Sequence, residues 1–229
     1  MSDEGKKETG NVPAETPEAS PPAVAGEGPR YLDDDELTTP RIKIDHDTGK
    51  FVNNLTEEEF EELNCVLLDV RLSRVRWDKN LDNQEPLCRS NDRVKGEGNP
   101  GGECAKCSLQ EWTNGDKPEC AETHTYLGLD EAGAPFFFTV SRTGIPPSRR
   151  YLSGAQYRRK PIYATWTVLT LKAQKKGGNT YYVPVFKRGE SVAEELLPEM
   201  NEAMRQLGAV WERYQARREE TEGAGGADF

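Results

Sequence analysis

Apolar and polar side chains alternate along several stretches of the chain, which is the pattern of half-buried β-strands. The clearest stretch is 65–77, where an apolar face and a polar face can be separated. Its apolar set is Val66, Leu68, Val70 and Leu72, and its polar set is Asp69, Arg71 and Ser73. Further strands are predicted over 125–130, 135–141, 161–173 and 180–187.

Turn residues connect these strands, and two segments have helical periodicity. A turn is expected at 131–133, and Gly177 and Gly178 lie in a predicted hairpin at 175–179. Helices are predicted over 147–159 and 191–218, the second opening with Ser191 and Glu194 at capping-box spacing. Its apolar stripe is expected to pack on the strands and comprises Leu196, Met200, Ala203, Leu207, Val210 and Tyr214.

Many short strands and two helices predict a mainly β, α+β fold, built as a small antiparallel barrel or sandwich. The domain is expected to span 38–218, between a disordered acidic arm at 1–37 and a flexible acidic tail at 219–229. No apolar run reaches the ~18 residues of a membrane span, and the first residues do not have the pattern of a secretory signal. A cytoplasmic protein without membrane contact is therefore expected.

Charge is distributed unevenly along this acidic chain, whose net charge is −10. Residues 1–37 carry ten acidic and three basic side chains, whereas 142–188 contain eleven Lys or Arg and no Asp or Glu. The basic stretch also holds seven of the nineteen aromatic residues. Cations interleaved with rings can neutralise phosphates and stack bases, so the stretch predicts a single-stranded nucleic-acid site despite the acidic average.

The predicted site residues fall into two classes. Electrostatic capture is assigned to Arg142, Arg149, Arg150, Arg158, Arg159, Lys160, Lys172, Lys175, Lys176, Lys187 and Arg188, with Arg71 as a secondary candidate. Base stacking is assigned to members of the set Tyr151, Tyr157, Tyr163, Trp166, Tyr182 and Phe186, with Trp77 as a secondary candidate. Alternation places Tyr182 and Phe186 on one face of their strand and Tyr181, Val183 and Val185 on the core face. Tyr163 and Trp166 are expected on opposite faces.

Four of the five cysteines follow a Cys-x15-Cys-x2-Cys-x12-Cys spacing within a Gly-rich and polar insert at 80–122. They are Cys88, Cys104, Cys107 and Cys120. The insert lacks the apolar residues of a core, so a structural Zn²⁺ held by four thiolates is the favoured interpretation. An iron–sulfur cluster, two disulfides and four unrelated thiols are the alternatives. His124 is a reserve ligand, and Cys65 is predicted to be a core thiol.

The chain does not contain the sequence signatures of the common enzyme classes. A phosphate-binding P-loop, a nucleophile elbow and a dinucleotide glycine pattern are all missing, and there are only two histidines. We therefore expect a binding protein rather than an enzyme. A nuclease or another DNA-processing enzyme is the second alternative, since carboxylates are plentiful.

The chain ends in Asp228 and Phe229, after a flexible acidic tail. This ending resembles the tail tips of bacterial and phage single-stranded-DNA-binding proteins. The resemblance implies that the terminal ring and carboxylate dock on replication or recombination proteins.

Residues 40–190 resemble a family of tailed-phage proteins, several of which are treated as single-stranded-DNA-binding proteins. The resemblance rests on Pro40–Ile44, Gly49–Asn53, Arg74–Asp78, Cys88–Ser90, the four-cysteine insert and Thr139–Arg142. It implies an OB-like barrel with a zinc insert, which binds single-stranded DNA without sequence preference in phage replication or recombination. The first alternative is a phage protein-interaction factor that binds host transcription or replication machinery through its zinc segment.

Overall fold

Two long antiparallel strands, β4 (Glu62–Trp77) and β8 (Cys120–Asp130), form the middle of the sheet. The computed structural model describes residues 38–78, 86–113 and 116–224. Beyond β8 follow β9 (Pro135–Ser141), β1 (Arg41–Asp45), β2 (Lys50–Asn53) and β3 (Glu59–Phe60). The other edge of β4 is shared. Its residues Glu62–Val66 pair with β10 (Thr165–Lys176), which forms a hairpin with β11 (Asn179–Ser191), and its last residues pair with β5 (Pro86–Ser90). Strands β6 (Lys95–Gly98) and β7 (Gly102–Glu103) continue from β5.

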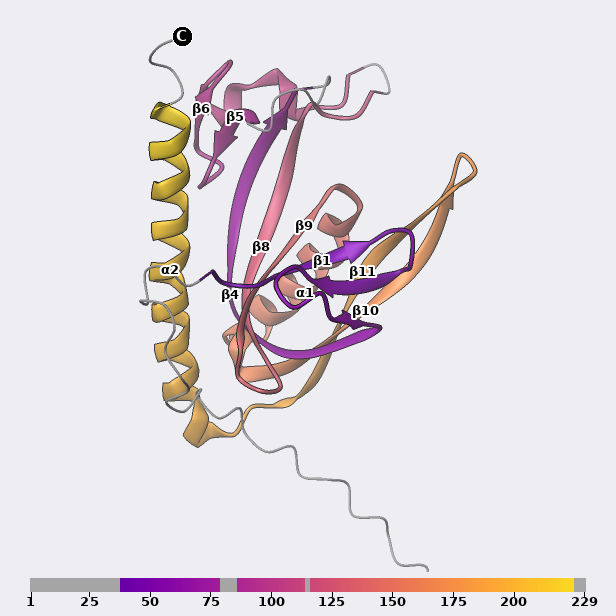
Figure 1. Ribbon diagram of the computed structural model, residues 1–229, viewed down its shortest axis with the longest axis vertical. Helices are drawn as coiled ribbons and strands as arrows, with labels where there is room; N and C mark the ends of the chain where they lie inside the picture. The colour runs from indigo at the N-terminus through magenta and orange to yellow at the C-terminus, as the bar shows by residue number, and fades with distance from the viewer. Residues whose placement is uncertain (1–37, 79–85, 114–115, 225–229) are drawn as a thin grey trace, which may run out of the picture.

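Two helices cover opposite faces of the central strands (Figure 1). Helix α1 (Ile145–Tyr157) packs into a core that includes Tyr126 and Phe138, and α2 (Leu197–Ala224) runs along the other face over Leu127 and Phe137. Short 3-10 turns span Cys104–Lys106, Ser108–Gln110, Arg142–Gly144, Ile162–Ala164 and Glu194–Leu196. The predicted mainly β, α+β class is confirmed.

A β-bulge divides β4 into two parts. Leu67 lies opposite Gly128 and Asp69 lies opposite Leu127, so one extra residue, Leu68, stands on the β4 side. The alternation predicted for 65–77 is therefore wrong beyond the bulge. Val66 and Leu68 face α2, whereas Val70 packs on the α1 side.

The sheet curls around the α1-side core but does not close, so the predicted barrel is not confirmed. In the described residues, β11 pairs only with β10, and the β1–β2 hairpin reaches it through side chains. The backbone N–H of Tyr182 donates to His46 Nδ1 over 3.2 Å, and a Cβ on Gly49 would lie 2.4 Å from the Tyr182 ring. Glycine, at φ +73° here, is what permits this close approach.

The second helix begins later than predicted. Ser191 is the last residue of β11, and the 3-10 turn at Glu194–Leu196 has no side-chain cap, so the expected capping box does not form. Pro198 explains the start at Leu197, because proline is tolerated in the first turn of a helix. The helix extends to Ala224, into the predicted tail at 219–229. Its apolar stripe packs on the sheet as predicted, through residues such as Met200 and Leu207.

The cysteine insert is more regular than its composition predicts. Cys88 lies on β5, Cys120 is the first residue of β8, and Cys104 opens a 3-10 turn. The segment therefore continues the central sheet rather than forming a separate loop. The predicted arm at 1–37 and the docking residues Asp228 and Phe229 lie outside the described residues. Neither helix in the described part of the chain has the length and apolar character needed to cross a membrane.

Candidate nucleic-acid interface

A row of hydroxyl groups lines the α2-facing side of β4, β8 and β9 beyond the apolar contact with α2. Ser73 Oγ and Thr123 Oγ1 lie 2.6 Å apart, and the Oγ1 atoms of Thr125 and Thr139 lie 2.9 Å apart. Because side chains alternate along each strand, these groups belong to the same face as Leu127, which packs under α2. The face thus changes from apolar to polar along the length of α2.

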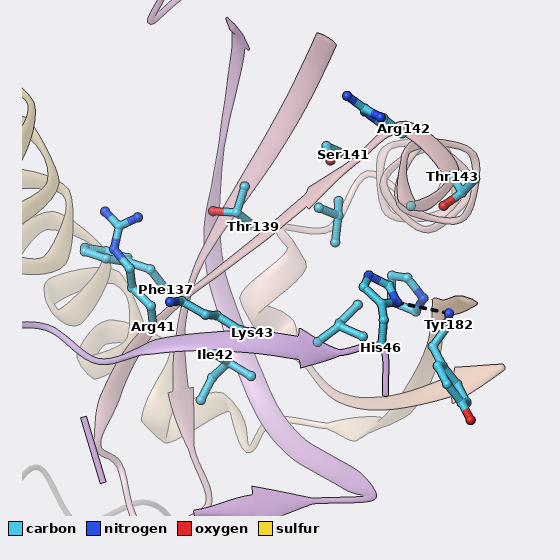
Figure 2. Close-up of a pocket in the computed structure, with 14 residues that line it drawn as sticks. Arg41, Ile42, Lys43, His46, Phe137, Thr139, Ser141, Arg142, Thr143 and Tyr182 are labelled. Carbon is cyan, nitrogen blue, oxygen red and sulfur yellow. Dashed lines mark hydrogen bonds between the residues drawn. The ribbon is translucent and has the colours of Figure 1, made fainter. Parts of the chain in front are cut away.

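Two adjoining cavities open over this polar face, and together we call them the groove. The helix-side cavity has a volume of about 330 Å³ and lies between the hydroxyl row and the α2 residues Trp211, Tyr214 and Gln215. The turn-side cavity has a volume of about 460 Å³ and extends along β1 to His46 and Tyr182 (Figure 2). Arg41, Thr139, Ser141 and Arg142 line both cavities, which makes the groove continuous.

The lining of the groove is basic. Its cations are Arg41, Lys43, Arg74, Arg89 and Arg142. Among the described residues that line the two cavities there is no Asp or Glu, although the whole chain carries ten more acidic than basic side chains. Such a lining attracts an anionic chain and places no carboxylate against it.

Aromatic rings stand beside the cations. Trp77 is 43 % exposed and lies at the end of β4, and Trp211 stacks on Tyr214 with ring centroids 5.8 Å apart. The Arg41 guanidinium lies 4.5 Å from the centre of the Tyr214 ring, a cation–π contact that holds the cation at the wall of the groove. The groove therefore combines positive charge with rings, the two features that single-stranded nucleic acid requires.

Arg142 occupies a strained position where β9 turns into α1. Its φ is +48°, in the left-handed region that side chains other than glycine seldom adopt. Strain of this kind persists where the surrounding structure imposes it and is frequent at functional sites. Figure 2 shows Arg142 above Ser141 and Thr139 on the same side of the groove.

Three predicted site residues therefore line the groove: Arg142, Trp77 and Tyr182. Sequence reasoning missed Arg41, Lys43, Arg74, Arg89 and Trp211. Arg41 and Lys43 carried a signal, because they alternate with Ile42 and Ile44 as the polar face of a strand. Arg74 and Arg89 lie far from the basic stretch in sequence, so only the fold brings them to it.

The predicted stacking rings are mostly core residues, which corrects the sequence-based assignment. Phe186 packs against Tyr126, Phe138 and Tyr151, with its ring centroid 5.2, 6.4 and 5.4 Å from theirs. Phe186 thus points into the core, whereas Tyr182, nearer the hairpin turn, lines the turn-side cavity. The predicted core face of β11 holds for Val183, which is buried, but Phe186 on the other face is also in the core, so both faces carry buried apolar residues.

Tyr163 and Trp166 both pack into the core beneath α2. They do not lie on opposite faces of a strand because Tyr163 belongs to the 3-10 turn that precedes β10. Among the predicted rings outside the groove, Tyr157 is exposed, at 91 %, at the end of α1.

Most predicted cations lie outside the groove. Arg71 lies beside Asp69, 3.3 Å away, and its guanidinium reaches Gly208 of α2, which corrects its assignment to an open surface. Arg149 forms an ion pair with Glu122. The exposed remainder follows α1 and the β10–β11 hairpin and comprises Arg150, Arg158, Arg159, Lys160, Lys172, Lys175, Lys176, Lys187 and Arg188. The acid-free stretch is thus spread over several surfaces.

Three of the four insert cysteines lie near one another. A Cβ placed on Gly96 would be 3.0 Å from Cys88 Sγ and 3.7 Å from Cys104 Sγ. Burial raises the pKa of Cys120, and the charges of Cys88 and Cys104 contribute to the same rise. Cys107 lies between the two 3-10 turns of the insert, and its N–H donates to the carbonyl of Cys104 over 3.1 Å. All these cysteines are free thiols, and the described residues contain no group of three or more His, Cys, Asp or Glu arranged to hold a metal ion.

His124 is held by other partners and lies in the interior. Its Nδ1 is 2.6 Å from Ser148 Oγ and its Nε2 is 2.8 Å from Glu122 Oε1. Ser148 Oγ also lies 2.6 Å from the Tyr126 hydroxyl. One proton arrangement satisfies all of them: Tyr126 donates to Ser148, Ser148 donates to His124, and His124 donates to the Glu122 carboxylate. Ser148 is fully buried, so this network joins α1 to β8 and leaves His124 no free nitrogen for zinc.

The network predicts a loss of stability in weak acid. Burial lowers the pKa of His124, against the opposing effect of its hydrogen bond to Glu122. The unfolded chain therefore binds a proton at this site more readily than the folded chain. The free energy of unfolding should fall as pH drops through about 6.5, the pKa of an unperturbed histidine. Urea titrations between pH 7.5 and 5 measure the slope of the free energy of unfolding against pH.

Glu122 adds a second loss at lower pH. Burial acts to raise its pKa, but His124, Arg149 and Arg93 outweigh it and the pKa is lowered, so its stabilisation disappears only in stronger acid. His124→Gln should flatten the slope between pH 7 and 5.5. His46→Gln, at the exposed second histidine, is the matched control and should keep it. An unchanged slope in His124→Gln would contradict the assignment.

Comparisons with known proteins give no relatives. No family model, no curated protein and no solved structure matches the chain. The groove therefore has to be interpreted from its own chemistry.

Proposed function

We propose that the chain binds single-stranded DNA along the groove. The observation that carries the proposal is the lining itself, in which five cations, a hydroxyl row and several rings adjoin without a carboxylate among the described residues. Phosphates would be met by Arg41, Lys43 and Arg142, and hydroxyls such as Thr139 would donate to phosphate or sugar oxygens. Unstacked bases would lie on Trp77 and Tyr182.

The groove favours one strand over a duplex. Its two cavities have volumes of about 330 and 460 Å³, the size of small-ligand pockets rather than of a cleft for a double helix. Rings at its walls stack on bases only where the bases are unpaired. The OB-like barrel and the phage replication or recombination role implied by the resemblance remain part of this proposal, as does docking of the C-terminal tail on replication partners.

Binding of fluorescein-labelled dT15, measured by anisotropy at increasing NaCl, tests the function. Single-stranded DNA loses affinity with a log–log slope of about −0.7 per neutralised phosphate, so five engaged cations predict a slope of roughly −3.5. A duplex of equal length should bind more weakly. If micromolar dT15 at 20 mM NaCl gives no anisotropy change, the proposed function is wrong.

We also propose that Cys88, Cys104, Cys107 and Cys120 hold a structural Zn²⁺. The support is the approach of Cys88 and Cys104 at Gly96, which has no side chain to separate the two thiols, together with the electrostatic coupling of Cys120 to both of them. Four thiolates close a tetrahedral site, so the ion would stabilise the end of the sheet and not act on substrate. Arg89 of the groove follows Cys88 on β5, and Ala121 of the groove follows Cys120 on β8. The ion would thereby fix one wall of the groove.

A further inference from the structure

A third cavity adjoins the groove at the end of the two central strands. Its volume is about 860 Å³, which is larger than either cavity of the groove, and it lies between the insert and the first turn of α1. Arg74, Ala121 and Arg142 line both this cavity and the helix-side cavity. The third cavity is therefore continuous with the proposed binding surface.

The third cavity lies on the opposite face of the sheet from the groove. Side chains alternate along β8, so Glu122 lines the third cavity whereas Thr123 lines the groove. Arg142 directly follows β9 and lines both sites. In the part of the chain that the structure describes, β1 pairs with β9 no further than Phe138, so the last part of β9 has no strand on its outer side. A chain in the groove can pass around this edge at Arg142.

An exposed ring stands at the wall of the third cavity. Trp112 is 70 % exposed, whereas tryptophan is on average a largely buried residue. The backbone next to it is held, because Thr113 and Asp116 exchange two N–H to carbonyl hydrogen bonds of 2.9 and 3.3 Å. Trp112 thus offers a flat surface on which an unpaired base can stack.

Positive charge dominates the lining of the third cavity. Its cations are Arg74, Lys117, Arg142, Arg149 and Lys176, and its carboxylates are Asp116 and Glu122. Glu122 forms ion pairs with Arg149 and with Arg93, so its charge is compensated. Lys117 belongs to the insert and Lys176 is the last residue of β10, so positive charge reaches the cavity from separate elements. This lining attracts an anionic chain.

Resting on the proposed function, we propose that the third cavity is a second contact for the same DNA strand. The strand would leave the groove at Arg142, pass around the edge of β9 and place a base on Trp112. Its phosphates would lie near Lys117 and Lys176. An exposed tryptophan can also bind a protein, but DNA is favoured here because the cavity shares the cations Arg74 and Arg142 with the groove.

Binding of a long and a short labelled strand, dT15 and dT5, tests the second contact by anisotropy. Trp112→Ala should weaken dT15 binding about tenfold, within the usual cost of removing one stacking ring. The same variant should change dT5 binding less than twofold, because a short strand occupies the groove alone. Trp112→Phe keeps a ring and should bind dT15 within threefold of wild type. Lys117→Gln with Lys176→Gln should reduce the salt slope for dT15 by about 1.4.

Tyr157→Ala is the matched control, because this ring is 91 % exposed and lines none of the three cavities. It should bind both strands as wild type does. The second contact is wrong, while the proposed function stands, if Trp112→Ala binds dT15 as tightly as wild type or loses the same factor with both strands. Unchanged dT15 binding would assign Trp112 to a protein partner instead. If wild type does not bind dT15, the proposed function itself fails.

Discussion

Lys43→Gln combined with Arg142→Asn should weaken dT15 binding about a hundredfold at 50 mM NaCl. Each of the two cations lines the groove, and loss of one charged contact costs roughly tenfold, or about 1.4 kcal/mol. Asparagine is chosen at 142 because it tolerates the left-handed backbone that Arg142 adopts, so the fold is preserved. The salt slope should decrease by about 1.4, which is two phosphates at 0.7 each.

The matched control removes two other cations of the predicted basic stretch. Arg158→Gln with Arg159→Asn makes the same change in net charge, and Arg159 also has a left-handed φ, of +54°. These residues are exposed beyond the end of α1, outside the groove. The control should bind within about threefold of wild type, since distant exposed charges are screened. Equal losses of dT15 affinity in the two double variants would show that binding depends on overall charge, and would contradict the assignment of the groove.

Protein purified without chelator should contain one zinc per chain, and removal of the zinc should lower Tm by roughly 10 °C. Structural zinc contributes several kcal/mol to folding, and each kcal/mol shifts Tm by about 2–4 °C for a chain of this size. Cys104→Ser and Cys120→Ser should each lose the metal, because a tetrahedral site with three thiolates binds it much more weakly. Plasma mass spectrometry gives the metal content, and calorimetry gives Tm.

Cys65→Ala is the control for these variants. Cys65 is fully buried in the α1-side core, and burial raises the pKa of its thiol, so it is neither a ligand nor a thiolate. This variant should keep one zinc per chain while losing some stability from the smaller side chain. Wild-type protein with neither zinc nor iron would rule out the metal site, and iron in place of zinc would assign the cysteines to a cluster.

The strands could be predicted from the sequence because most of them alternate, and β9 agrees at both ends with the predicted 135–141. The curl of the sheet could not be predicted from the sequence, because it depends on pairing between strands that lie far apart along the chain. The bulge at Leu68 could not be predicted either, since Leu68 is apolar and fits an uninterrupted alternation. The capping box predicted from Ser191 and Glu194 does not form, for a local reason. Their spacing matches a cap, but the β11 ladder continues through Ser191.

The candidate site was predictable only in part. Arg142 and Tyr182 belong to the basic stretch and do reach the groove, yet Tyr151 and Phe186 from the same stretch fill the core. Composition cannot separate a ring that stacks on a base from a ring that packs on its neighbours. Arg41 and Arg74 join the site because β1 lies beside β9 and β4 lies beside β8, and these neighbours are far apart in sequence.

The single extra residue at Leu68 decides which side chains of β4 line the groove. Before it, even-numbered residues such as Val66 face α2. After it, odd-numbered residues such as Ser73 and Val75 do so and line the groove. Deletion of Leu68 would remove the bulge and leave Asp69 opposite Leu127 and Ser73 opposite Thr123, so Ser73 would stay on the groove face. The bulge therefore lets β4 place Val66 and Leu68 under α2 and Val70 on the α1 side, so that the polar side chain of Ser73 is left to line the groove.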